Sequence, residues 1–503
     1  MKKYIFFLLL LLTISLSSCD TAIEVVDCDK YPSHVDCLTD PDPDPDPITC
    51  ETGFELVGDK CEEIEILTCE TGFEVVGDKC EAIVVEDFLE IYYLNDLQGS
   101  ALSNYYNGLS TINMLNLMGL DAFVVGNHEF DWGLDTILNY QDGNLDNGEA
   151  DFPFLAANIV YKGTDDMPEE IDPYTIITKG THKIGVIGTI GYGLEGSIAE
   201  SKVSPYEFLD PMPFIEQYAT YLRTVENCDV IIVVAHDSGR INDDVAALTG
   251  DAKVDAVFNG HSHSTYANMN NGIPEIQSGS NGKNVGYVKM TFDDVGDISY
   301  DIDNLTKYSD ALFHTEDTDV QALLDTYLLE TDDLFNTPIF NSENAVSKGE
   351  LTDWISELIN KSVGADISFH NYGGTRTDIE DSESISLGLL YQIWPFDNVI
   401  KTSVLTGTEV NALIASGSLG YYTDITYFDP SELYLVATND YVYDKPTNPF
   451  LDGLDPTNTG LLLRDLALTE MEKQALIYDT FDVDNEIVTT YQDYAYLLEE
   501  TAN

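Results

Sequence analysis

From Asp87 onward, short β-branched runs ending in polar loops alternate with longer segments whose apolar residues have helical spacing. The strand-like runs are "AFVV" before Gly126, "KIGVIGTIG" from Lys183, "DVIIVVAHDSG" from Asp229 and "VDAVFNGHSH" from Val254. Helical patches such as "STINMLNLMGL" lie between them. Strands that alternate with helices predict an α/β domain, which we place at residues 87–305.

A second folded unit is predicted at residues 337–503. It has a strand of its own, "ADISFHN", and a helix, "TGTEVNALIASG". Between the two units, residues 306–336 include the run "ALFHTEDTDVQALLDTYLLETDDLF", which has helical patterning and predicts a helical connector.

The first 48 residues have a different character. Residues 1–19 combine two lysines, a short apolar run and small residues, as a secretion signal does. The segment ending at Cys19 resembles the lipobox of bacterial lipoproteins, in which that cysteine is lipidated; a plain signal peptide with a chance cysteine is the alternative. Residues 20–48 contain "DPDPDPDP" and predict an extended tether. We expect an exported lipoprotein, at the cell surface or in the periplasm, that meets the membrane through its lipid anchor only.

Residues 49–86 contain one unit twice, "TCETGFELVGDKCEEIEIL" and "TCETGFEVVGDKCEAIVVE". Each copy carries a cysteine pair around a Gly-Asp turn, Cys50 with Cys61 and Cys69 with Cys80. In an exported protein this predicts two disulfide-closed hairpins, with zinc binding as the alternative. The lone Cys228 is predicted to be a buried core residue.

The chain is strongly acidic, with 22 Lys and Arg against 90 Asp and Glu and a net charge of −68. A basic surface is needed to displace counterions from nucleic acid, so nucleic acid is excluded as a partner. The same charge repels a phosphate ester at long range. Any phosphate site must therefore supply its own positive charge, most simply as metal ions.

Polar residues follow three of the predicted strands: Asn127 to Asp131, then His236 and Asp237, then His261 to His263. Sites in α/β folds form at the carboxyl ends of strands, so we expect these positions to converge. Imidazole nitrogens with amide or carboxylate oxygens suit divalent ions such as Zn²⁺ or Mn²⁺.

The motifs "VVGNHEFDWG", "VVAHDSG" and "NGHSH" resemble those of calcineurin-like metallophosphoesterases, specifically the secreted 5′-nucleotidases and UDP-sugar hydrolases. In the second unit, "FHNYGGTR" and "WPFDN" resemble that family's C-terminal domain. The resemblance covers about residues 88–503. It implies a four-layered α/β/β/α metallophosphoesterase domain followed by a smaller α/β nucleotide-binding domain.

The resemblance also implies roles for individual residues. Asn127, His236 and His261 match ligands of one metal, and His263 falls where a second metal takes a ligand. His128 matches the catalytic histidine beside the phosphate, and Asp131 matches the residue that orients it.

In the second unit, Asn371, Gly374 and Arg376 match substrate contacts. Phe396 and Tyr441 match an aromatic pair that holds the base. The alternatives are a simple turn for Asn371 and the glycines, and a surface aromatic for Tyr441. Where relatives place a second phosphate-binding arginine, Lys348 is the nearest counterpart.

The stretch "IYYLNDLQGSALSNYYNG", residues 91–108, matches the approach to the family's first metal motif and then the exit from its second. The strand–helix–strand segment between them, about 30 residues or more, is predicted to be absent. Asp96 fits the first motif by spacing, which places Gln98 where a ligand histidine belongs. If Asp96 is instead the metal-bridging aspartate, the first motif is lost.

We therefore expect a 5′-nucleotidase-type hydrolase that releases phosphate from nucleotides, with UDP-sugars or cyclic nucleotides as other substrates of the same class. The alternative is a nucleotide-binding lipoprotein with impaired catalysis. The family uses two divalent ions, and the ligands left in this chain furnish about one site.

Overall fold

The computed structural model describes residues 87–96, 100–293, 295–306, 308 and 315–494, and the backbone of four short segments before them, 54–57, 60–63, 73–76 and 79–82. The predicted signal, Cys19, the tether and the cysteine side chains of the repeats lie outside the described residues, as does Gln98. Within the described part, no helix combines the length and apolar character that crossing a membrane requires.

The two repeats form two β-hairpins. In the first copy, β1 (Phe54–Val57) pairs antiparallel with β2 (Lys60–Glu63). In the second, β3 (Phe73–Val76) pairs with β4 (Lys79–Ala82) in the same register, so that Val75 faces Cys80 as Leu56 faces Cys61. The disulfides predicted to close these hairpins involve side chains outside the described residues, so they stay predictions.

A six-stranded sheet forms the centre of the α/β part, in the order β10-β11-β13-β14-β16-β15. The neighbours β11, β13, β14 and β16 run parallel, whereas β10 and β15 pair antiparallel at the edges. Its strands are β10 (Tyr174–Lys179), β11 (His182–Ile190), β13 (Val230–His236), β14 (Ala256–Asn259), β15 (Thr265–Asn270) and β16 (Ile273–Ser278). Because both faces of the central strands are buried, they are continuous apolar runs rather than alternating ones.

Smaller sheets complete this part. They have the orders β18-β17-β5, β6-β7-β9 and β12-β8. Their strands are β5 (Asp87–Tyr93), β6 (Phe123–Val124), β7 (Phe154–Leu155), β8 (Ile159–Tyr161), β9 (Ile171–Asp172), β12 (Tyr206–Phe208), β17 (Val285–Phe292) and β18 (Ile298–Leu305). Among the described strands, β5 and β6 each stand at the end of their sheet.

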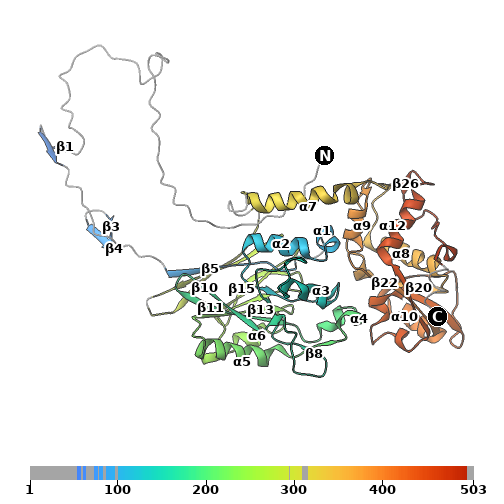
Figure 1. Cartoon of the computed structure of the whole chain (residues 1–503), viewed down its shortest axis with the longest axis horizontal. Helices are drawn as coiled ribbons and strands as arrows, with labels where there is room; N and C mark the ends of the chain where they lie inside the picture. Colours follow the sequence, from blue (N-terminus) through green and yellow to red (C-terminus); the bar gives the residue numbers. More distant parts are fainter. Residues whose placement is uncertain are drawn as a thin grey trace, which may run out of the picture. The chain divides into compact units, whose positions relative to one another are not determined.

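Helices cover both outer faces, which confirms the predicted α/β class (Figure 1). On one side α5 packs on β11 and β13, and residues such as Ile215 and Leu222 fill the core with Ile231. On the other side α2 and α3 pack over β6 and β7. The helices are α1 (Ala101–Tyr105), α2 (Leu109–Met118), α3 (Leu134–Leu138), α4 (Glu200–Val203), α5 (Pro211–Thr224) and α6 (Asn242–Ala246). Cys228 is buried in this core and is a free thiol, as predicted.

The longest helix, α7 (Thr318–Asn336), begins where the Asp317 side chain accepts from the amides of Asp319 and Val320. A carboxylate at this position satisfies free amides and suits the helix dipole. The helix falls within the segment predicted as a connector.

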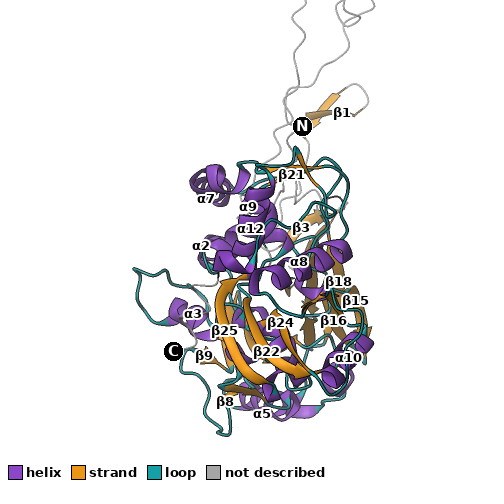
Figure 2. Cartoon of the chain, turned by 90° about the vertical axis from the view of Figure 1, so that its right-hand side faces the viewer, coloured by secondary structure: helices purple, strands orange, loops and turns teal. Residues whose placement is uncertain are grey.

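The remaining residues form a five-stranded sheet, β23-β20-β24-β22-β25, with helices on both faces (Figure 2). Helices α8 and α12 bury one face and α10 and α11 the other. The elements are β19 (Phe340–Ser342), α8 (Lys348–Val363), β20 (Ile367–Asn371), β21 (Ser384–Ile385), α9 (Leu387–Ile393), β22 (Val399–Thr406), α10 (Gly407–Ser416), β23 (Leu419–Tyr422), β24 (Leu433–Asn439), α11 (Asp440–Tyr443), β25 (Leu454–Leu462), α12 (Leu463–Gln474) and β26 (Thr480–Phe481).

Candidate metal and phosphate site

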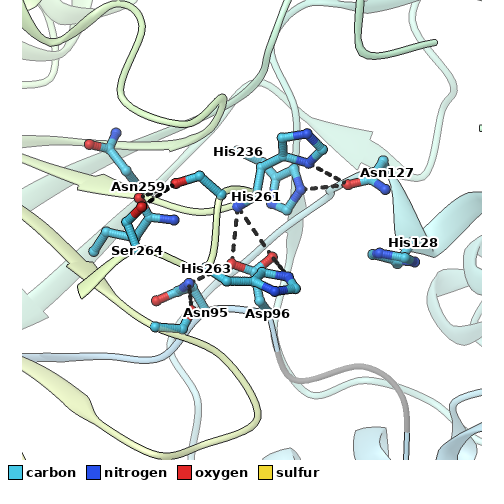
Figure 3. A network of polar contacts seen from close by, with 12 residues as sticks. Asn95, Asp96, Asn127, His128, His236, Asn259, His261, His263 and Ser264 are labelled. Atoms are coloured by element: carbon cyan, nitrogen blue, oxygen red, sulfur yellow. Dashed lines mark hydrogen bonds and ion pairs between the residues drawn. The ribbon is translucent and has the colours of Figure 1, made fainter. Parts of the chain in front are cut away.

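Three of the predicted site residues meet at one point. His236 is the last residue of β13, and His261 follows the neighbouring parallel strand β14. Their ring nitrogens approach the same atom, the side-chain oxygen of Asn127, at 2.7 Å from His236 Nε2 and 3.0 Å from His261 Nδ1 (Figure 3). The expected convergence at the carboxyl ends of the strands therefore occurs for these three residues.

Two glycines allow His236 to lie at this point. A Cβ atom added to Gly126 would come within 2.8 Å of the His236 ring, and one added to Gly260 would come within 2.8 Å of its Nδ1. Either contact is too short for carbon, so a side chain at these positions would push the imidazole away from Asn127. Both glycines lie within the motifs VVGNHEFDWG and NGHSH, but the motifs alone do not indicate this steric role.

The three histidines around this point favour the neutral form. Burial lowers the pKa of His236 well below its ordinary value, and the neighbouring His261 adds to the shift. Burial also lowers the pKa values of His261 and His263. Since a metal ion binds the neutral imidazole, these shifts favour metal binding over protonation.

Asp96 lies beside this group. Its carboxylate accepts the backbone amide of His261 at 3.0 and 3.2 Å, and its Oδ1 is 3.9 Å from His263 Nε2. Asn95 holds the carboxylate from the other side, because its Nδ2 donates to Asp96 at 2.5 Å and to the Gly279 carbonyl at 2.7 Å. Asn95 thus fixes the orientation of the Asp96 carboxylate, and no motif in the sequence indicates this contact.

The backbone of the site is unusual at three positions. Asp96, His261 and His263 have positive φ angles of 51°, 78° and 56°. Residues other than glycine rarely take this left-handed region, and such conformations gather at binding sites where the surrounding structure holds them.

The donor atoms at this point are of types that bind divalent ions such as Zn²⁺ or Mn²⁺, namely imidazole nitrogen and amide oxygen. In the part of the chain that the structure describes, no three His, Cys, Asp or Glu side chains form a metal-holding group. The third donor here is the amide oxygen of Asn127, so any site rests on two imidazoles and one amide.

His128 and Asp131 form the predicted pair, since His128 Nδ1 is 2.8 Å from Asp131 Oδ2. Burial by itself would lower the pKa of His128, but the charge and hydrogen bond of Asp131 outweigh it and raise the pKa above 6.5. The adjacent Glu129 is a buried carboxyl group that accepts the Gly126 amide, and burial raises its pKa to about 7. The carboxylate of Asp131 therefore favours the protonated form of His128.

The substrate-binding residues predicted in the second unit begin at the end of β20. The side-chain oxygen of Asn371 accepts from Asn439 at 2.9 Å, which leaves its amide nitrogen to donate elsewhere. A Cβ atom at Gly374 would lie 2.7 Å from His370 Nε2, so this position requires glycine.

Phe396 connects the two groups of predicted residues. Its ring is nearly parallel to that of His128, with centroids 6.0 Å apart, and the guanidinium of Arg376 lies 5.8 Å from its centroid. Tyr441, at the start of α11, carries the Lys445 ammonium 4.1 Å above its ring. Lys348 is an exposed residue at the start of α8. The roles of Phe396, Tyr441 and Lys348 toward a substrate stay predictions.

This chain is similar to several known proteins. Residues 330–423 match the family model described as "5'-nucleotidase, C-terminal domain". A cell wall protein of Listeria monocytogenes is 26% identical over 65% of this chain, and a snake venom 5′-nucleotidase of Naja atra is 33% identical over 40%. The solved 5′-nucleotidase precursor of Thermus thermophilus aligns with a TM-score of 0.63 at 20% identity, covering 77% of this chain and 88% of that one.

The predicted resemblance and fold class are confirmed by these matches. The chain spans 48% of the Listeria protein and 40% of the venom protein, so about half or less of these curated relatives. The likeness to the solved structure, at this level of identity, concerns the fold.

Proposed function

We propose that this chain is a metal-dependent phosphoester hydrolase that releases phosphate from nucleotides, as a 5′-nucleotidase does. The observation that carries the proposal is the meeting of Asn127, His236 and His261 at one point, with the His128–Asp131 pair beside them. A donor set for a cation next to a histidine with a raised pKa is suited to hydrolysis of an anionic ester.

Each group has a distinct task in this proposal. A bound divalent ion would supply positive charge to the phosphate and lower the pKa of a coordinated water. Asn127, His236 and His261 would hold that ion. Protonated His128, kept in position by Asp131, would donate a proton to the departing alkoxide oxygen of the nucleoside.

The nucleoside part would be held by the second unit. Phe396 would offer a flat apolar ring to a base, Arg376 would offer a positive charge 5.8 Å from the centre of that ring, and Asn371 would offer an amide donor. The same residues would serve the second candidate function, a nucleotide-binding protein with impaired turnover. That candidate is favoured by the predicted absence of one metal-binding segment and by the lack of three clustered ionisable ligands among the described residues.

We further propose that the protein is exported and tethered through Cys19, with the Asp/Pro-rich segment and the hairpins as a spacer. The signal-like N-terminus and the match to a cell wall protein support this location.

The proposed function is tested by measuring phosphate release from AMP, a UDP-sugar and a cyclic nucleotide, with added Mn²⁺ or Zn²⁺ and with a chelator. Release that needs the metal supports the hydrolase, and the relative rates identify the substrate class. Binding of AMP without release under any of these conditions would instead establish the binding protein.

Phe396→Ala should weaken AMP binding by about 1–3 kcal/mol, the range for stacking of a base on an aromatic ring. The loss should appear in AMP affinity measured by calorimetry, with little change in hydrolysis of a small phosphate ester that has no base. Tyr441→Ala is the matched aromatic variant, and its effect tests whether the second ring takes part. Equal losses for AMP and for the small ester would refute a base-stacking role for Phe396.

A further inference from the structure

Arg464 is one of only four arginines in a chain of net charge −68, and it is almost completely buried. It is the second residue of α12. A positive side chain in the first turn of a helix opposes the helix dipole, and burying a guanidinium is costly unless it is paired. Its position therefore calls for strong partners.

Three partners of Arg464 lie on one loop, residues 394–398, between α9 and β22. Nη1 donates to the carbonyl of Trp394 at 3.0 Å and to that of Pro395 at 3.2 Å. Nη2 forms an ion pair with the carboxylate of Asp397. The guanidinium also stacks on Tyr391 in α9, 3.7 Å from its centroid.

These contacts surround Phe396 along the chain. Arg464 binds the two peptide carbonyls before Phe396 and the side chain after it. The next residue is held as well, because the amide of Leu463 donates to the carbonyl of Asn398 at 2.9 Å. A planar guanidinium with several fixed donors can hold such a loop in one conformation, which the point charge of a lysine cannot do.

We propose that Arg464 is a positioning residue that fixes the 394–398 loop so that Phe396 presents its ring to a nucleobase. This inference rests on the proposed function, since it deepens the role of Phe396 in that site. The two arginines then have different roles. Arg376 lies over the Phe396 ring, whereas Arg464 donates to backbone carbonyls of the loop that carries this ring.

The test is a double-mutant cycle on AMP affinity, measured by calorimetry with a chelator present so that no hydrolysis occurs. The proteins are the wild type, Phe396→Ala, Arg464→Lys and the double variant. Stacking of a base on an aromatic ring contributes about 5- to 150-fold to affinity. We expect Arg464→Lys to bind AMP about 5- to 20-fold more weakly than the wild type. In the Phe396→Ala background the same change should have almost no further effect.

Controls separate positioning from general stability. Glu470→Gln lies in the same helix and removes a buried carboxylate that accepts the amides of Val488 and Thr489. It should lower the melting temperature without changing AMP affinity. If Arg464→Lys does not fold, Asp397→Ala replaces it, because Asp397 is partly exposed and its substitution removes the same ion pair from the loop side. The loss of AMP affinity in Asp397→Ala should also vanish in the Phe396→Ala background.

The outcomes are distinguishable. Unchanged AMP affinity in Arg464→Lys, or a loss that simply adds to that of Phe396→Ala, overturns the positioning role alone. Unchanged affinity in Phe396→Ala overturns the proposed base site itself, whatever Arg464 does. A loss in Arg464→Lys that disappears in the Phe396→Ala background supports the inference.

Discussion

Replacing His128 by alanine should slow phosphate release from a nucleotide by about 10²- to 10⁴-fold, the usual contribution of a positioned acid or base. The reason is the proposed role of His128 as proton donor to the leaving oxygen, for which its contact with Asp131 and its raised pKa suit it. The measurement is initial release of phosphate from AMP at saturating metal.

Metal content provides the control for this variant. Two contacts bring Asn127, His236 and His261 together, and His128 takes part in neither. His128→Ala should therefore bind the divalent ion as the wild type does. AMP affinity should change by far less than the rate. Retention of full activity in His128→Ala would show that the departing oxygen needs no proton from this side chain.

The chain should bind about one divalent ion, and His236→Ala should weaken that binding by about 100-fold or more. Removal of residues that only support a metal ligand costs about 10- to 100-fold, so removal of a ligand should cost at least as much. Stoichiometry follows from elemental analysis after dialysis, and affinity from a competitive metal titration. The two variants should differ in metal binding: His236→Ala should lose the ion, whereas His128→Ala should keep the ion and lose turnover.

Two tightly bound ions per chain would contradict the ligand count. That count rests on residues 91–108, where a strand–helix–strand segment with further ligands is predicted to be absent. In the structure, β5 ends within this stretch and β6 follows it, and the two strands stand at the ends of separate sheets. Insertion of a segment carrying D-x-H and G-D should therefore raise both metal content and turnover, while insertion of the same segment with alanines at those ligands should raise neither.

Much of the fold was predictable because its cause is local. The apolar runs around Val186 and Val233 are continuous, as strands buried on both faces require, and these became the parallel strands β11 and β13. The meeting of His236 and His261 followed from the rule that parallel strands end at one edge of the sheet.

The rest depended on contacts between residues distant in sequence. Asn95, which donates to Asp96, is itself held by the carbonyl of Gly279, and no spacing in the sequence indicates that pairing. Arg464 lies almost 70 residues from the loop it holds. The orientation of Tyr441 is equally a product of tertiary packing, and its sequence position alone does not decide which ring or charge it faces.

The left-handed backbone at Asp96, His261 and His263 also limits how these positions can change over evolutionary time. Asp, Asn, His and glycine tolerate this region, whereas a β-branched side chain there is a strained outlier. The residue types found at all three positions are therefore favoured by conformation as well as by chemistry. Neutral drift at these positions would run toward Asn or Gly rather than Val or Ile, even in a descendant that no longer bound metal. A polar residue kept at these three positions in other chains is therefore weaker evidence for catalysis than a histidine kept at position 236. The backbone at His236 is not in the left-handed region and would accept many side chains.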